Sequence, residues 1–123
     1  MNEENEIIET PFACDMTAIP VERRADHLAT IDAVFSSVEE IREVSDGYAF
    51  RLRRSTKTLQ MAKEFIELER LCCPFFGFVL EVTGESGEIW LTLNGRDGVK
   101  PFILAEIGNH LPVRIRPKDL TSS

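Results

Sequence analysis

The feature that most constrains the fold is a pattern of elements that the chain uses twice: an amphipathic helical segment followed by two strand-like segments. Apolar residues recur at helical spacing in residues 21–36 and 56–73, which predicts two helices. Each helix is followed by two segments rich in strand-forming residues, namely 38–45 with 48–53 and 76–83 with 88–95. Two helix–hairpin units of this kind favour one antiparallel sheet.

Turn and capping residues separate these segments. Asp46-Gly47 is a strong two-residue hairpin signal, Ser55 or Thr56 can cap the second helix, and Pro74 stops it. A last helix, GVKPFILAEIGN, completes the order α-β-β-α-β-β-α. This order predicts an α+β two-layer sandwich, a four-stranded antiparallel sheet with helices on one face. It equals a ferredoxin-like chain whose first strand has moved to the end.

Length and charge limit the classes of protein that fit. The 123 residues suit a single α+β domain over 12–110, with a flexible acidic N-terminus at 1–11 and an extended tail at 111–123. A net charge of −7 argues against nucleic-acid binding. No apolar run reaches the ~20 residues of a membrane helix, and the acidic N-terminus is unlike a signal peptide. A cytoplasmic location, where thiols stay reduced, is therefore expected.

One face of such a sheet has no helix over it. Trp90 and Val79 fall on the parity opposite to the apolar core positions of their strands. A tryptophan on an open face needs a cover, for which the N-terminal arm, the tail or a second copy of the chain are candidates. We predict a homodimer through this open sheet face.

The stretch ELERLCCPFFGF places Cys72 and Cys73 side by side at the end of the second helix. Neighbouring Cα atoms lie ~3.8 Å apart, whereas disulfides prefer ~4.4–6.8 Å, so a bond between these two cysteines is disfavoured. The dipole at a helix C-terminus and the nearby Glu69 disfavour a reactive thiolate. The same field favours a bound soft cation, which deprotonates the thiols itself.

The third cysteine, Cys14, precedes the first helix. If this arm crosses the end of the second helix, three sulfurs converge in a site suited to Hg(II), As(III), Cu(I) or Zn(II). A fourth ligand would come from His27, Asp15 or Glu69. Two alternatives stay open: a redox disulfide of Cys14 with Cys72 or Cys73, and cysteines that only pack in the core.

Other polar residues favour structural roles. His27 is expected at the boundary between the first helix and solvent, as most lone helical histidines are. Arg51, Arg53 and Arg54 are expected to form a solvated face balanced by nearby glutamates.

Several segments together, AC-D, GY-F-L, F-ELER-CCPFFGF and IWL-L-GR-GVKPF, resemble a family of small uncharacterised bacterial proteins. The resemblance spans about residues 12–104 and carries over Cys14, Glu69, Cys72, Cys73 and Phe75. Members of that family often lie near thiol-dependent metal-response regulators, which implies a thiol site. The family has no established activity, so the resemblance implies no particular reaction.

The leading hypothesis is a cytoplasmic protein that binds a soft metal or metalloid ion through the thiolates of Cys14, Cys72 and Cys73. Glu69 would act as an auxiliary ligand or as a hydrogen-bond acceptor behind the sulfurs. The alternatives are a thiol redox protein and a non-catalytic interaction module whose open sheet face binds a partner.

Overall fold

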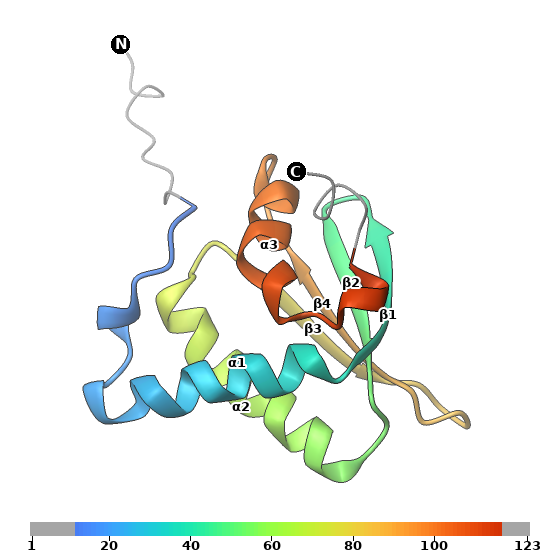
Figure 1. The fold of residues 1–123 in the computed structure, drawn as a ribbon. Coiled ribbons are helices and arrows are strands. Elements are labelled where there is room, and N and C mark those ends of the chain that lie inside the picture. Colours follow the sequence, from blue (N-terminus) through green and yellow to red (C-terminus); the bar gives the residue numbers. More distant parts are fainter. Residues whose placement is uncertain (1–11, 117–123) are drawn as a thin grey trace.

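The computed structural model describes residues 12–116, which form one four-stranded sheet and three α-helices (Figure 1). The elements follow as α1 (Arg24–Ser36), β1 (Val38–Val44), β2 (Gly47–Leu52), α2 (Thr56–Cys72), β3 (Gly77–Val82), β4 (Ile89–Asn94) and α3 (Val99–Ile107). The predicted order α-β-β-α-β-β-α is confirmed. The predicted flexible segment 1–11 and residues 117–123 of the predicted tail lie outside the described residues.

All neighbouring strands of the sheet run antiparallel in the order β1-β2-β4-β3. The two strands of each hairpin pair with each other, β1 with β2 and β3 with β4. In the middle of the sheet β2 pairs with β4, with Leu52 opposite Ile89. A ferredoxin-like chain with its first strand moved to the end has this same strand order. The middle strands are thus the most enclosed part of the sheet.

The first hairpin turns one residue earlier than the Asp46-Gly47 signal predicts. Val44 pairs with Gly47, so the two loop residues are Ser45 and Asp46. Gly47 is required for a different reason, because a Cβ atom there would lie 1.9 Å from the carbonyl oxygen of Leu93 in β4. The glycine allows β4 to approach β2 closely at the first paired residue.

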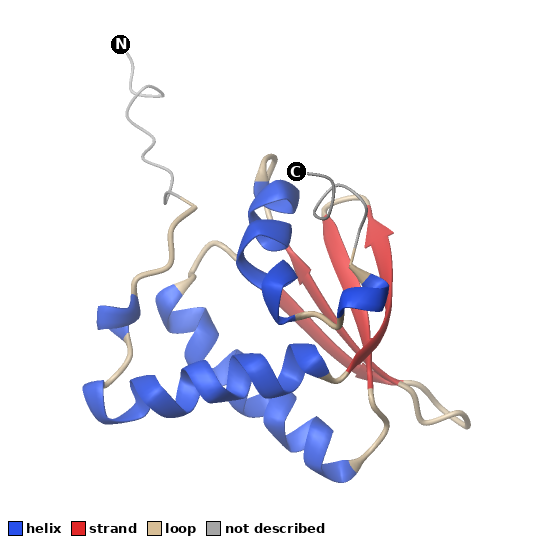
Figure 2. Ribbon diagram, in the orientation of Figure 1, coloured by secondary structure: helices blue, strands red, loops and turns tan. Residues whose placement is uncertain are grey.

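The three helices pack on one face of the sheet (Figure 2). Phe35 of α1 lies at the centre of this layer and meets Phe50 of β2 and Phe65 of α2 edge-on, with ring centroids 5.3 and 5.2 Å away. Ile103 of α3 joins the same buried cluster. The predicted arrangement of helices on a single face is therefore confirmed.

The helix α1 exposes one residue of its apolar pattern and buries a histidine instead. Leu28, Ile31 and Phe35 lie at helical spacing, but Leu28 is 56% exposed, and the buried residues are His27, Val34 and Phe35. His27 can be buried because a polar partner on α2 accepts its hydrogen bond. The expectation that His27 lies at the solvent boundary is wrong.

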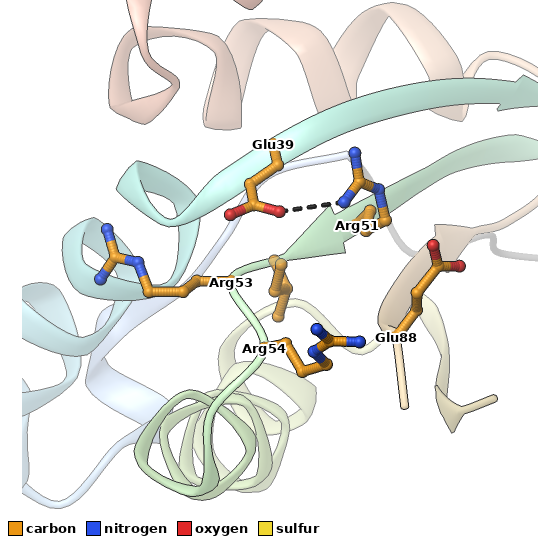
Figure 3. A pocket seen from close by; sticks show the side chains of 6 residues that line it. Glu39, Arg51, Arg53, Arg54 and Glu88 are labelled. Atoms are coloured by element: carbon orange, nitrogen blue, oxygen red, sulfur yellow. Dashed lines mark hydrogen bonds and ion pairs between the residues drawn. The ribbon is translucent and has the colours of Figure 1, made fainter. Parts of the chain in front are cut away.

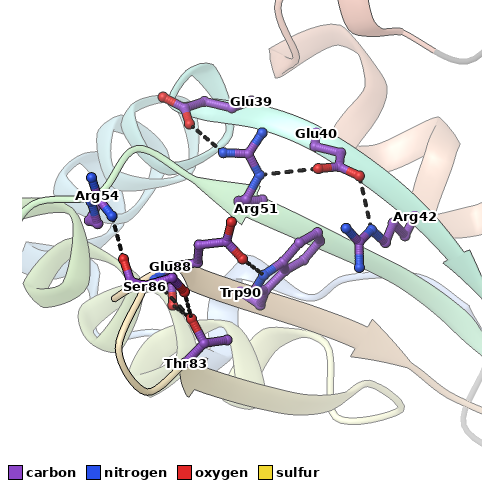
Figure 4. Close-up of polar contacts among 9 residues, drawn as sticks. All are labelled: Glu39, Glu40, Arg42, Arg51, Arg54, Thr83, Ser86, Glu88 and Trp90. Atoms are coloured by element: carbon purple, nitrogen blue, oxygen red, sulfur yellow. Dashed lines mark hydrogen bonds and ion pairs between the residues drawn. The ribbon is translucent and has the colours of Figure 1, made fainter.

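On the open face of the sheet, neighbouring side chains of the same chain cover Trp90. The Arg42 guanidinium lies 4.5 Å from the centroid of the Trp90 ring, and Trp90 Nε1 donates to Glu88 Oε1 over 3.2 Å (Figure 4). Arg42 in turn pairs with Glu40, which also binds Arg51. Trp90 is thereby only 7% exposed without a second copy. The homodimer stays a prediction, and burial of Trp90 does not require it.

The described part of the predicted tail contacts the domain. Leu111 is buried, residues Val113–Ile115 form a short 3-10 turn, and Ile115 packs against the core. None of the helices within residues 12–116 is both long and apolar enough to cross a bilayer.

Candidate thiol site

The last turn of α2 aligns an acid with two cysteines. Ser55 caps the start of the helix by accepting from the Thr58 N–H over 3.0 Å. The helix ends at Cys72, and Cys73 is its C-cap, where its N–H donates to the Glu69 carbonyl over 2.8 Å. Glu69, Cys72 and Cys73 thus stand three and four residues apart, a spacing that brings side chains to one face of a helix.

The N-terminal arm crosses the end of α2, as the leading hypothesis requires. The Asp15 N–H donates to the Cys72 carbonyl over 2.8 Å, which satisfies a carbonyl that the helix leaves open. Beside this bond, the Phe12 ring meets the Phe75 ring edge-on at a centroid distance of 5.3 Å. These contacts place Cys14 against the two cysteines of α2.

Cys14 and Cys73 are joined by a disulfide, with Cα atoms 4.7 Å apart, and Cys72 is a free, buried thiol. The sulfurs of Cys72 and Cys73 lie 3.6 Å apart, so these neighbours are not bonded to each other, as predicted. The predicted convergence of three sulfurs is confirmed. Of the two disulfides kept as alternatives, the structure contains the one between Cys14 and Cys73.

Glu69 connects the sulfurs to a buried histidine. One carboxylate oxygen, Oε1, lies 2.8 Å from His27 Nε2 and 3.6 Å from the Cys72 sulfur. The other, Oε2, lies 3.3 Å from the Cys73 sulfur. A disulfide sulfur carries no hydrogen, so this last contact is not an S–H···O hydrogen bond. Glu69 is only 4% exposed, so little water reaches its carboxylate. Among the described residues, His27 forms its shortest polar contact.

Only one of the three predicted fourth ligands joins the sulfurs. Ligand atoms of Cys14, Glu69, Cys72 and Cys73 all lie within 4.8 Å of one another. His27 instead forms a hydrogen bond with the Glu69 carboxylate, and its ring stacks on the Phe65 ring with centroids 6.1 Å apart. Asp15 caps the turn at Met16–Ala18 by accepting from Thr17, which lowers the pKa of its carboxyl.

The site is negative and disfavours a thiolate. Burial first, and then the nearby charge of Glu69, raise the pKa of the Cys72 thiol to about 12. Burial and the same Glu69 charge also raise the pKa of Glu106, which His110 partly opposes. Cys72 is therefore a poor nucleophile at neutral pH, as the position at a helix C-terminus predicts.

A pocket of about 280 Å³ adjoins the sulfurs. Cys14, Glu69 and Cys72 line one part of it, and Glu106 and His110 contribute further polar groups. Its remaining lining is apolar: Met16, Leu28, Ile31 and Ile107. The pocket brings together segments that lie far apart in the sequence, the N-terminal arm and the helices α1, α2 and α3.

A second pocket, of about 430 Å³, lies near the start of α2 and is lined by three arginines and two glutamates (Figure 3). Arg51 binds Glu39 over 3.0 Å, and Arg54 donates to the Ser86 carbonyl. The Arg53 side chain extends away from those of Arg51 and Arg54. Arginines and glutamates lie side by side in this region, in agreement with the predicted solvated face whose charges are balanced.

Comparisons of the chain with protein-family models, with curated proteins and with solved structures find no match. The function is therefore inferred from the thiol site itself, where an acid, a free thiol and a disulfide meet.

Proposed function

We propose that this protein, in its reduced form, holds a soft metal or metalloid ion through the sulfurs of Cys14, Cys72 and Cys73. The observation that carries the proposal is the convergence of three sulfurs and the Glu69 carboxylate within 4.8 Å. These groups come from two segments that lie 55 or more residues apart in sequence. Cysteines that only filled space in the core would not need to meet in this way. Thiolate sulfur is the ligand that selects soft ions.

The spacing of the sulfurs supports this proposal. Two thiolates that share a tetrahedral ion, with bonds of about 2.3 Å, lie about 3.8 Å apart. The sulfurs of Cys72 and Cys73 are 3.6 Å apart, close to that value. Glu69 Oε1 and Oε2 lie 3.6 and 3.3 Å from these two sulfurs, so small shifts would bring one oxygen to the same ion.

The charge of the site also favours a cation. Glu69 is buried beside the sulfurs, Glu106 lines the pocket, and the C-terminal end of α2 adds its partial negative charge. The raised pKa of the Cys72 thiol means that an incoming ion must itself displace the proton. The same property argues against Cys72 as an attacking nucleophile.

The disulfide sets a condition on binding. While Cys14 and Cys73 are bonded to each other, only the Cys72 sulfur and Glu69 remain as ligands. Two electrons and two protons must convert this disulfide into thiols before three sulfurs can bind one ion. A reducing compartment such as the predicted cytoplasm would supply that form.

The experiment is an anaerobic titration of the fully reduced protein with Cd(II) and Hg(II), followed by sulfur-to-metal charge-transfer absorption. We expect one ion per chain, with weaker binding in Cys14→Ser and none in a variant with all three cysteines replaced by serine. Ser36→Ala, an exposed change at the end of α1, is the matched control and should bind like the wild type. Equal absorption for the wild type and the triple variant would refute the proposal.

A redox role is the second candidate, and the Cys14–Cys73 disulfide beside a free Cys72 thiol favours it. A redox protein would exchange this disulfide with a partner thiol and would not need Cys72. Mass analysis under graded thiol buffers separates the two ideas. Rapid exchange that is unchanged in Cys72→Ser, without ion binding, would favour redox chemistry.

A further inference from the structure

The pocket beside the sulfurs is larger than a bare ion requires. Its volume is about 280 Å³, whereas a water molecule in the liquid takes about 30 Å³. An apolar cavity of about 150 Å³ in another protein is enough to hold a benzene molecule. The space next to Cys14 and Cys72 can therefore accept an organic group of that size together with the atom that the sulfurs bind.

The lining of this pocket is divided by chemistry. Cys14 and Cys72 line one part, while Leu28, Ile31 and Ile107 supply apolar side chains. Leu28 is 56% exposed, although the spacing of apolar residues in α1 predicts it in the core. An exposed leucine that borders a pocket is a natural contact for an apolar ligand.

We propose that the ligand of this site is a trivalent organoarsenical with one aryl substituent, bonded through arsenic to Cys14 and Cys72. This inference rests on the proposed function and names its ligand class. The aryl ring would lie against Leu28 and Ile31. Both bonding cysteines line the pocket, whereas Cys73 does not.

The chemistry balances without a redox change at arsenic. An arylarsonous acid, R–As(OH)₂, condenses with the two thiols to give R–As(S–Cys)₂ and two molecules of water. Each As–O bond is replaced by an As–S bond, and each thiol proton leaves in water. The Cys14–Cys73 disulfide must first be reduced by two molecules of a low-molecular-weight thiol, which leave as their own disulfide.

The arsenical class follows from the number of sulfurs on the pocket wall. Arsenic(III) with one carbon substituent takes two thiolates and keeps the organic group, so two sulfurs and an apolar wall match it. A bare ion would use the sulfurs and leave Leu28 and Ile31 without a role. Because a bare ion would also use the sulfurs of Cys14 and Cys72, the test must vary the organic group alone.

The test compares phenylarsonous acid with methylarsonous acid on the reduced full-length protein, each in competition with a small free dithiol. The competition removes the intrinsic difference in thiol affinity between the two arsenicals. We expect the protein to prefer the phenyl compound by at least about tenfold relative to the free dithiol, because the ring leaves water. Cys73→Ser, which keeps both bonding thiols, should retain this preference.

Two variants locate the ring. Leu28→Gln should reduce the phenyl preference several-fold while methylarsonous acid still binds. Val21→Gln is the matched control, since Val21 is also exposed (69%) and lies outside the pocket lining. A tenfold phenyl preference that falls in the first variant and not in the second supports the proposal.

Three results would overturn it. Equal relative affinity for the two arsenicals refutes the aryl ligand and leaves the soft-ion proposal standing. A phenyl preference that Leu28→Gln does not change places the ring elsewhere and also refutes it. Failure of both arsenicals to bind, together with failure of Cd(II) and Hg(II), removes the proposed function as well.

Discussion

The disulfide between Cys14 and Cys73 should contribute a large share of the stability of this small domain. The two residues are 59 apart in sequence, so the bond closes a loop of about 60 residues. In the chain-entropy description, closing such a loop stabilises the fold by about 4 kcal/mol, because the unfolded chain loses conformations. The Asp15 N–H also donates to the Cys72 carbonyl over 2.8 Å, and we expect this bond to hold the arm in place when the disulfide is reduced. We therefore expect the main effect of reduction to lie in the unfolded state.

Urea denaturation of the oxidised and reduced protein measures this difference, and the buried Trp90 serves as the fluorescent reporter. With a slope of about 1–3 kcal/mol per molar urea, a loss of 4 kcal/mol lowers the midpoint by more than about 1 M. Cys14→Ser should behave like the reduced wild type. Cys72→Ser keeps the disulfide and should show the full difference between its two forms. A difference below about 1 kcal/mol would contradict the entropy argument.

Three further predictions follow from buried or covered side chains. In the folded oxidised protein at pH 8, Cys72 should react with a thiol-alkylating reagent on the order of 1,000-fold more slowly than in urea, since its pKa is raised from 9.0 to about 12. Glu69→Gln should speed that reaction, because it removes a charge that raises the pKa. His27→Ala should lower the free energy of unfolding by about 3 kcal/mol, because it leaves the Glu69 carboxylate buried without its partner. His27→Gln should lower it less. Equal losses for the two variants in urea titrations would argue against this pairing. Arg42→Ala should shift the Trp90 emission to longer wavelength and cost about 0.5–1 kcal/mol, and an unchanged spectrum would mean that the guanidinium does not cover the ring.

The fold could be predicted because its determinants are local. Periodicity gives the helices and strands, and two hairpins separated by helices leave few ways to form one sheet. The exact turn at Ser45 and Asp46 could not be predicted from the same pattern. Gly47 is required by the approach of Leu93 from a strand more than 40 residues later, and such a contact has no local pattern.

The site was predicted in part, and the missing part was His27. Convergence of the cysteines was predicted on the condition that the arm crosses the end of α2, and the hydrogen bond from the Asp15 N–H to the Cys72 carbonyl meets that condition. The role of His27 depends on Glu69, which is 42 residues away on another helix. One sequence feature indicates it: His27, Ile31 and Val34 share a stripe at spacings of four and three residues, so the histidine lies on the buried side of α1.

Ion binding and disulfide formation compete for the same two sulfurs, so each must alter the equilibrium of the other. An ion that binds the reduced site and not the Cys14–Cys73 disulfide stabilises the reduced form by about 2.7 kcal/mol at a hundred times its dissociation constant. For a two-electron couple this raises the reduction potential by about 60 mV. Equilibration in glutathione buffers with and without Cd(II), corrected for Cd(II) bound by glutathione, would measure the shift. Linkage is reciprocal, so an unchanged potential despite tight binding would mean that the ion does not use Cys14 or Cys73.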